Sequence, residues 1–157
     1  MDTSTIIIGA ILLAICILPF VLISRNRKKK EQELLKSLTN LANEHQSKIS
    51  QFEVCGDQMI GIDEDTKSIF FIKQTDKETV VKHVSLSNVQ HCELVKTTVN
   101  SSGDTIIDRL ELKFVPIDPH QPQYIIEFYN LSERFQLNGE LQMIEKWFKI
   151  IEDLIKK

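Results

Sequence analysis

Cysteine and glycine are both scarce in this chain, and their scarcity excludes several kinds of site. Only 3 of the 157 residues are cysteine, and no two of them form a C-x-x-C pair. A disulfide framework and a cysteine-based zinc site are therefore excluded. The 5 glycines are all isolated, so the chain has neither a Walker loop nor a G-x-G-x-x-G turn to hold a nucleotide phosphate.

The usual patterns of catalytic and metal-binding residues are missing as well. Residues 63–68 begin like a calcium loop, but Lys67 and Ser68 stand at its fifth and sixth positions, where a ligand and a glycine are required. His91 and Cys92 are neighbours on an expected strand, so we expect Cys92 to point inward and His91 outward. We therefore predict no catalytic, cofactor-binding or metal-binding residues, and no enzyme activity.

Net positive charge is also lacking beyond residue 50. Residues 1–50 contain 7 Lys and Arg against 4 Asp and Glu, a net charge of +3. Residues 51–157 contain 12 against 18, a net charge of −6. An acidic domain repels phosphate backbones, so binding to nucleic acid is disfavoured.

What the chain does have is a long uncharged run near its N-terminus. No charged residue occurs in residues 3–24, and the apolar core of this run, residues 6–23, would rise about 27 Å as a helix. That length is close to the hydrocarbon thickness of a bilayer. The sequence predicts a single transmembrane anchor in residues 1–24, with residues 3–24 in contact with lipid.

A basic collar follows the anchor and predicts its orientation. It contains five cations and has no counterpart before the run: Arg25, Arg27, Lys28, Lys29 and Lys30. Cations beside a span tend to remain cytoplasmic, so we expect the N-terminus outside the cell (plasma or inner) membrane and residues 25–157 in the cytoplasm. A cleaved signal peptide is the disfavoured alternative, because its positive charge would precede the apolar stretch.

The collar leads into a linker of residues 25–50, in which we predict a short helix over residues 31–49. Leu34, Leu38, Leu41 and His45 recur at heptad-like spacing over about two and a half heptads, fewer than a coiled coil normally needs. Two interpretations stay open. The favoured one is a connector that packs on its own domain, and the other is a helix that pairs two chains in a homodimer.

Residues 51–157 predict a single α+β domain. Residues 106–115 alternate strictly, with Leu110, Leu112 and Phe114 on one face, as in a half-buried antiparallel strand. An amphipathic helix of about 17 residues should follow Asn138, the expected N-cap. The seven predicted strands are 53–56, 59–63, 68–73, 79–86, 89–99, 106–115 and 124–129, and residues 133–137 are expected to add a short extended stretch.

This order of elements resembles the pleckstrin-homology-like (PH-like) fold, and specifically small bacterial membrane-anchored domains of that kind. The resemblance is carried by residues 84–94, by Phe70-Phe71-Ile72 and by the closing helix around Trp147. It implies seven antiparallel strands in a bent barrel or sandwich, capped by the C-terminal helix. Pleckstrin-homology domains in the eukaryotic sense often bind inositol phosphates through basic residues around the first hairpin, but the matching residues 54–62 contain no Lys or Arg.

The resemblance further implies a recognition scaffold that uses an open strand edge or the groove beside the helix. We therefore expect a cytoplasmic module that binds a protein or peptide at the membrane surface. The alternative is a structural protein whose residues 31–49 pair chains. Tyr124, Tyr129 and Phe135 are candidate surface aromatics, with packing in the domain as their favoured use.

Overall fold

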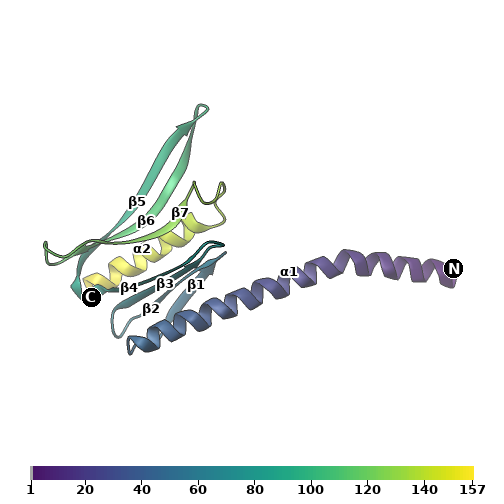
Figure 1. Cartoon of the computed structure of the whole chain (residues 1–157), viewed down its shortest axis with the longest axis horizontal. Coiled ribbons are helices and arrows are strands. Elements are labelled where there is room, and N and C mark those ends of the chain that lie inside the picture. Colours follow the sequence, from purple (N-terminus) through teal and green to yellow (C-terminus); the bar gives the residue numbers. More distant parts are fainter. Residues whose placement is uncertain (1) are drawn as a thin grey trace.

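The computed structural model describes residues 2–157 and has two helical layers and two antiparallel sheets (Figure 1). A long helix, α1, leads into four strands, a short 3-10 helix, three more strands and a closing helix, α2. Their bounds are α1 Thr3–Glu44, β1 Gln51–Cys55, β2 Gln58–Asp63, β3 Ser68–Gln74, β4 Thr79–Ser85, η1 Leu86–Asn88, β5 Val89–Ser101, β6 Asp104–Pro116, β7 Tyr124–Asn130 and α2 Glu140–Lys156.

The anchor and the linker form one helix instead of the two predicted from the sequence. Helix α1 runs for 42 residues and continues through Pro19. It is the one helix of residues 2–157 that is long and apolar enough to cross a membrane, and its apolar stretch is exposed throughout. The helix ends at Glu44, five residues before the predicted end. Gln46 takes a φ of 56°, and the Asp63 carboxylate accepts a hydrogen bond from the Lys48 N–H at 2.7 Å.

The seven predicted strands are all present, but they do not close into a barrel. They form a four-stranded sheet in the order β1-β2-β3-β4 and a separate three-stranded sheet in the order β5-β6-β7. Helix α2 lies between the two sheets (Figure 1). Its buried side chains fill the space between the sheets, so the edge strands on that side do not pair with each other. These side chains are Met143, Ile144, Trp147, Ile151 and Leu154.

The main core lies where α2 meets the inner faces of the two sheets. Leu110, Leu112 and Phe114 of β6 are fully buried there, which confirms the alternation expected from the sequence. Phe71 of β3 and Phe128 of β7 meet with ring centroids 5.2 Å apart, so the two sheets also contact each other directly.

A second cluster joins α1 to the outer face of the four-stranded sheet. Leu34, Leu38 and Ala42 pack on a group from β2 and β3 that comprises Met59, Phe70 and Ile72. Gly61 permits this close approach, because a methyl group at residue 61 would lie 2.8 Å from Leu38 Cδ2. The heptad-like positions Leu34 and Leu38 therefore contact their own domain, which matches the connector interpretation.

Two local expectations before α2 were wrong. Residues 133–137 form no strand, and the helix has Gly139 rather than Asn138 at its N-cap. Gly139 has a φ of 109°, a left-handed conformation that favours glycine. The buried Glu140 carboxylate accepts hydrogen bonds from the Asn138 N–H and from Arg134, so it supplies acceptors for two donors of the loop that precedes the helix.

Candidate functional site

Each sheet has an edge strand on the same side of the β domain, β4 in one sheet and β7 in the other. Strand β4 pairs only with β3, and β7 pairs only with β6, among the residues that the structure describes. Residues of β4 and β7 line one cleft, and residues of the β3–β4 turn and of β7 line another. One cleft contains His83 and Tyr124, and the other contains Glu78 and Asn130. We call the boundary between these two strands the β4–β7 seam.

The opposite edges of the two sheets are covered by α2. The Glu53 carboxylate of β1 accepts the Trp147 Nε1–H at 2.9 Å and Lys146 Nζ at 2.8 Å. On β5, the main-chain N–H of Cys92 donates to Glu152 Oε1 of α2 at 2.8 Å. Because α2 occupies that side, the β4–β7 seam is where edge strands of both sheets remain without a covering helix.

A lysine on β4 supports the view that the seam is open to water. Lys82 shares its face of the strand with Val84, which is buried in the core, yet Lys82 itself is exposed. A charged side chain on the core-facing side of an edge strand is a known device against unwanted strand pairing. The position therefore marks where the core ends and the seam begins.

The cleft that contains His83 and Tyr124 lies at one end of the seam, between the C-terminal end of β4 and the β6–β7 loop, and we call it the distal cleft. It measures about 610 Å³, within the range of small-ligand sites, and it mixes apolar with hydrogen-bonding side chains. Its lining comprises His83, Ser85, Asn88, Pro116, Ile117, Asp118, Gln121 and Tyr124. Such a lining suits an apolar or aromatic side chain with a polar end.

His83 connects the distal cleft to the joint between α1 and the sheet. Its ring stacks on Phe70, at a centroid distance of 4.9 Å, and on His45, at 3.9 Å, and the three rings form one cluster because His45 and Phe70 are 5.9 Å apart. Burial, followed by the charge of His45, lowers the pKa of His83 below its ordinary value. The imidazole is therefore neutral near pH 7, and its buried Nε2 makes no hydrogen bond within residues 2–157.

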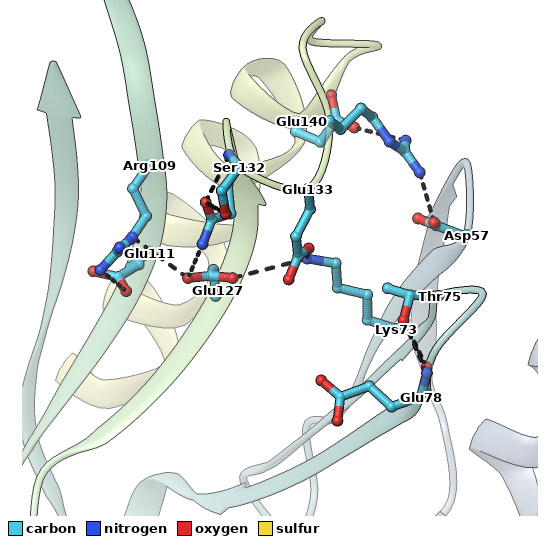
Figure 2. A network of polar contacts seen from close by, with 12 residues as sticks. Asp57, Lys73, Thr75, Glu78, Arg109, Glu111, Glu127, Ser132, Glu133 and Glu140 are labelled. Atoms are coloured by element: carbon cyan, nitrogen blue, oxygen red, sulfur yellow. Dashed lines mark hydrogen bonds and ion pairs between the residues drawn. The ribbon is translucent and has the colours of Figure 1, made fainter. Parts of the chain in front are cut away.

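The anchor-side cleft lies at the other end of the seam and measures about 430 Å³. It is lined by the β3–β4 turn, by the end of β7 and the loop after it, and by Lys30 of α1. Figure 2 shows the polar network beside it. Lys73 is nine-tenths buried there, and its Nζ lies 2.7 Å from Glu133 and 4.0 Å from Glu127.

Each of the other two cations in this network also contacts two carboxylates. Arg134 lies 2.6 Å from Asp57 and 3.4 Å from Glu140, so it ties the β1–β2 turn to the start of α2. Arg109 lies 3.5 Å from Glu127 and 3.8 Å from Glu111. These three cations therefore contact five carboxylates in all, so negative charge is in excess among the ion pairs of the network.

The five collar residues predicted from the sequence all lie on α1 and are exposed. Lys29 and Lys30 line a shallow cleft of about 350 Å³ together with Gln74, Thr75 and Asp76 of the β3–β4 region. The β domain therefore lies directly beside the last part of the collar, whereas Arg25, Arg27 and Lys28 stand further along the helix towards the N-terminus.

The remaining candidates from the sequence fall into different environments. Phe135 is 93% exposed and Tyr124 is about half exposed, but Tyr129 is buried. Cys92 is buried and His91 is partly exposed beside Glu93, as the alternation predicted. Within residues 2–157 no group of three or more His, Cys, Asp or Glu side chains is arranged to hold a metal ion.

Sequence reasoning did not find the polar network or the two clefts. Arg134 is 77 residues away from Asp57, and Lys73 is 60 residues away from Glu133, so no local spacing marks these pairs. The one available signal was Lys82, a lysine at a core-facing position of an otherwise apolar alternation.

Comparison with known proteins gives no assignment. No known family, curated protein or solved structure matches this chain.

Proposed function

We propose that this chain is a single-pass membrane protein whose β domain binds an extended segment of another protein in the β4–β7 seam. The observation that carries the proposal is the pair of unpaired edge strands that border one seam with a cleft at each end. An extended peptide can add to such an edge through main-chain hydrogen bonds, while pockets beside the edge select its side chains.

The dimensions of the seam fit this use. Strand β4 has 7 residues and so spans about 23 Å at 3.3 Å per residue. A guest strand of similar length would place one end near the anchor-side cleft and the other near the distal cleft. The distal cleft would then take an apolar or aromatic side chain of the guest, beside Tyr124 and Ile117.

The PH-like identity of the domain belongs to the same proposal. Its support is the element order, in which four strands, then three strands, precede one closing helix packed between the sheets. PH-like domains are used as recognition scaffolds, and the absence of Lys and Arg from residues 54–62 favours a protein ligand over an inositol phosphate.

Membrane placement supports a role in local recognition. The apolar part of α1 would hold the domain at the surface, and the collar would keep it on the cytoplasmic side. Protease added to sealed right-side-out vesicles should leave residues 51–157 uncut. Digestion of that region from outside would overturn the cytoplasmic placement.

Photo-crosslinking tests the seam directly. A benzophenone side chain is placed at Lys82 in the full-length protein in its native membrane, and the matched control carries it at Lys149, an exposed lysine on α2. We expect an adduct of defined mass from position 82 and none from position 149. Equal labelling from both positions, or none from position 82, would overturn the proposal.

The pairing alternative uses a face of α1 that is already occupied. Leu34 and Leu38 are buried against β2 and β3, so a dimer through residues 31–49 would have to release those contacts. We therefore expect a monomer in detergent. A dimer that persists on dilution, and that Leu38→Ala abolishes, would support the alternative instead.

A further inference from the structure

The anchor-side cleft lies close to where the chain would leave the membrane. Lys30 lines this cleft and stands six residues after Ser24, the end of the uncharged run, which is about 9 Å along a helix. Asn26 and Glu33 border the neighbouring shallow cleft with residues 74–76. The turns at this end of the domain point in the direction in which α1 runs towards its N-terminus (Figure 1).

Charge at this cleft favours a cationic guest. The lining of the cleft holds five carboxylates against four cations, an excess of one negative charge; these residues are Asp57, Asp76, Glu78, Glu133 and Glu140, and Lys30, Lys73, Lys77 and Arg134. Two of the carboxylates in the lining, Asp76 and Glu78, form no ion pair within residues 2–157.

We propose that the guest of the β4–β7 seam is the basic juxtamembrane segment of a second integral membrane protein, which enters through the anchor-side cleft. This inference rests on the proposed function and names the class of partner. The cytoplasmic flanks of membrane spans are rich in Lys and Arg, so they carry the charge that the cleft lacks. A segment that leaves the same bilayer beside α1 would have to cover about 9 Å to reach the cleft, and it would continue into the seam as an extended chain.

Position strengthens the argument from charge. Two proteins held in the same membrane meet at a high effective concentration, so a seam of modest intrinsic affinity suffices. A cationic segment suits this cleft better than an anionic lipid headgroup, because carboxylates outnumber cations in its lining. The collar on α1 provides the contact with such lipids instead.

The test uses full-length protein in nanodiscs of phosphatidylcholine, a lipid without net charge, and three fluorescent peptides. Each peptide has about eight residues, the length needed to follow β4. The first alternates Lys with Val and Thr and carries a palmitoyl group at one end. The second has Glu in place of every Lys, and the third is the Lys peptide without the acyl chain. The acylated Lys peptide should bind at least about tenfold more tightly than either of the others, and raised salt should weaken it.

A matched pair of variants locates the charge effect. Asp76→Asn with Glu78→Gln removes the two carboxylates of the lining that form no ion pair within residues 2–157, and the main-chain groups of Glu78 that bond to Thr75 are retained. This double variant should bind the acylated Lys peptide about two- to tenfold more weakly. Glu145→Gln with Asp153→Asn makes the same charge change on the exposed face of α2 and should leave binding unchanged.

The outcomes separate this inference from the proposed function. A benzophenone at the acylated end of the Lys peptide should label the β3–β4 turn rather than the distal cleft, and the reverse would overturn entrance from the membrane side. This inference is overturned if the Glu peptide or the unacylated peptide binds as tightly as the acylated Lys peptide. It is also overturned if the Asp76 and Glu78 double variant binds the acylated Lys peptide as tightly as the unaltered protein does. Either result leaves the seam as a peptide site. If a benzophenone at position 82 crosslinks to none of the three peptides, both this inference and the proposed function are overturned.

Discussion

Replacing Leu38 with alanine tests how firmly α1 is joined to the β domain. Leu38 is fully buried between α1 and the outer face of the four-stranded sheet. The backbone of Gly61 lies directly opposite and has no side chain that could move into the vacated space. We therefore expect the cavity to persist, and the free energy of unfolding to fall by about 3–4 kcal/mol, within the upper part of the usual range for Leu→Ala.

A second substitution makes the prediction specific to this contact. Gly61→Ala alone should cost about 1–3 kcal/mol, because its methyl group would lie 2.8 Å from Leu38 Cδ2 and 3.2 Å from Ile49 Cδ1. In the Leu38→Ala background the same methyl group enters the empty space. The double variant should therefore be more stable than the sum of the single effects, by about 1 kcal/mol or more.

Urea unfolding of the full-length protein in detergent provides the assay. Trp147 is the sole tryptophan and is fully buried in the main core, so its fluorescence reports exposure of that core. Because α1 packs on the other face of the sheet, the variant tests whether helix docking and core unfolding form one cooperative transition. A change below about 1 kcal/mol for Leu38→Ala, or strict additivity in the double variant, would refute the reasoning.

Three further predictions concern individual groups of the β domain. Glu53→Ala should lower the free energy of unfolding by about 1–3 kcal/mol in the same assay, because the buried Trp147 Nε1–H loses its acceptor. Glu53→Gln should retain most of the stability, and equal losses for both variants would contradict the role of this hydrogen bond. Burial raises the pKa of Cys92 to about 12, so alkylation by iodoacetamide at pH 8 should require unfolding and accelerate with urea; rapid labelling of the native protein would contradict it. Burial and His45 lower the pKa of His83, so the unfolded chain binds a proton first and stability should fall as the pH drops from about 6.5 towards the lowered pKa; His83→Gln should reduce this dependence, and an unchanged pH profile would contradict the assignment.

Particular elements show why local structure followed from the sequence. Leu110, Leu112 and Phe114 alternate because only one face of β6 meets the core, and that alternation is visible in the residues themselves. The turn between β5 and β6 falls in the gap between the predicted strands 89–99 and 106–115, where Ser102 and Gly103 take positive φ values in a segment rich in small polar residues. Boundaries that depend on distant groups were less accurate, as at Glu44, where Asp63 holds the chain after the helix.

The relation between the two sheets was not visible in the same way. Strand order within each sheet follows hairpins between neighbours, so it could be inferred from short turns. Whether the sheets close depends on how much space α2 takes between them, and α2 comes last in the chain. The expected barrel was wrong for this reason, and the candidate site at the β4–β7 seam exists because of it.

The sequence by itself determined the uncharged run of residues 3–24, the basic collar after it, and the alternating strands and amphipathic helix of the β domain. These features depend on hydrophobicity, charge and spacing along the chain, which require no knowledge of distant contacts. Only the tertiary structure decided that α1 is one helix packed on β2 and β3, that the sheets stay separate, and that Lys73 and Arg134 each lie between two carboxylates. Those outcomes depend on side chains many residues apart that meet only when the chain has folded.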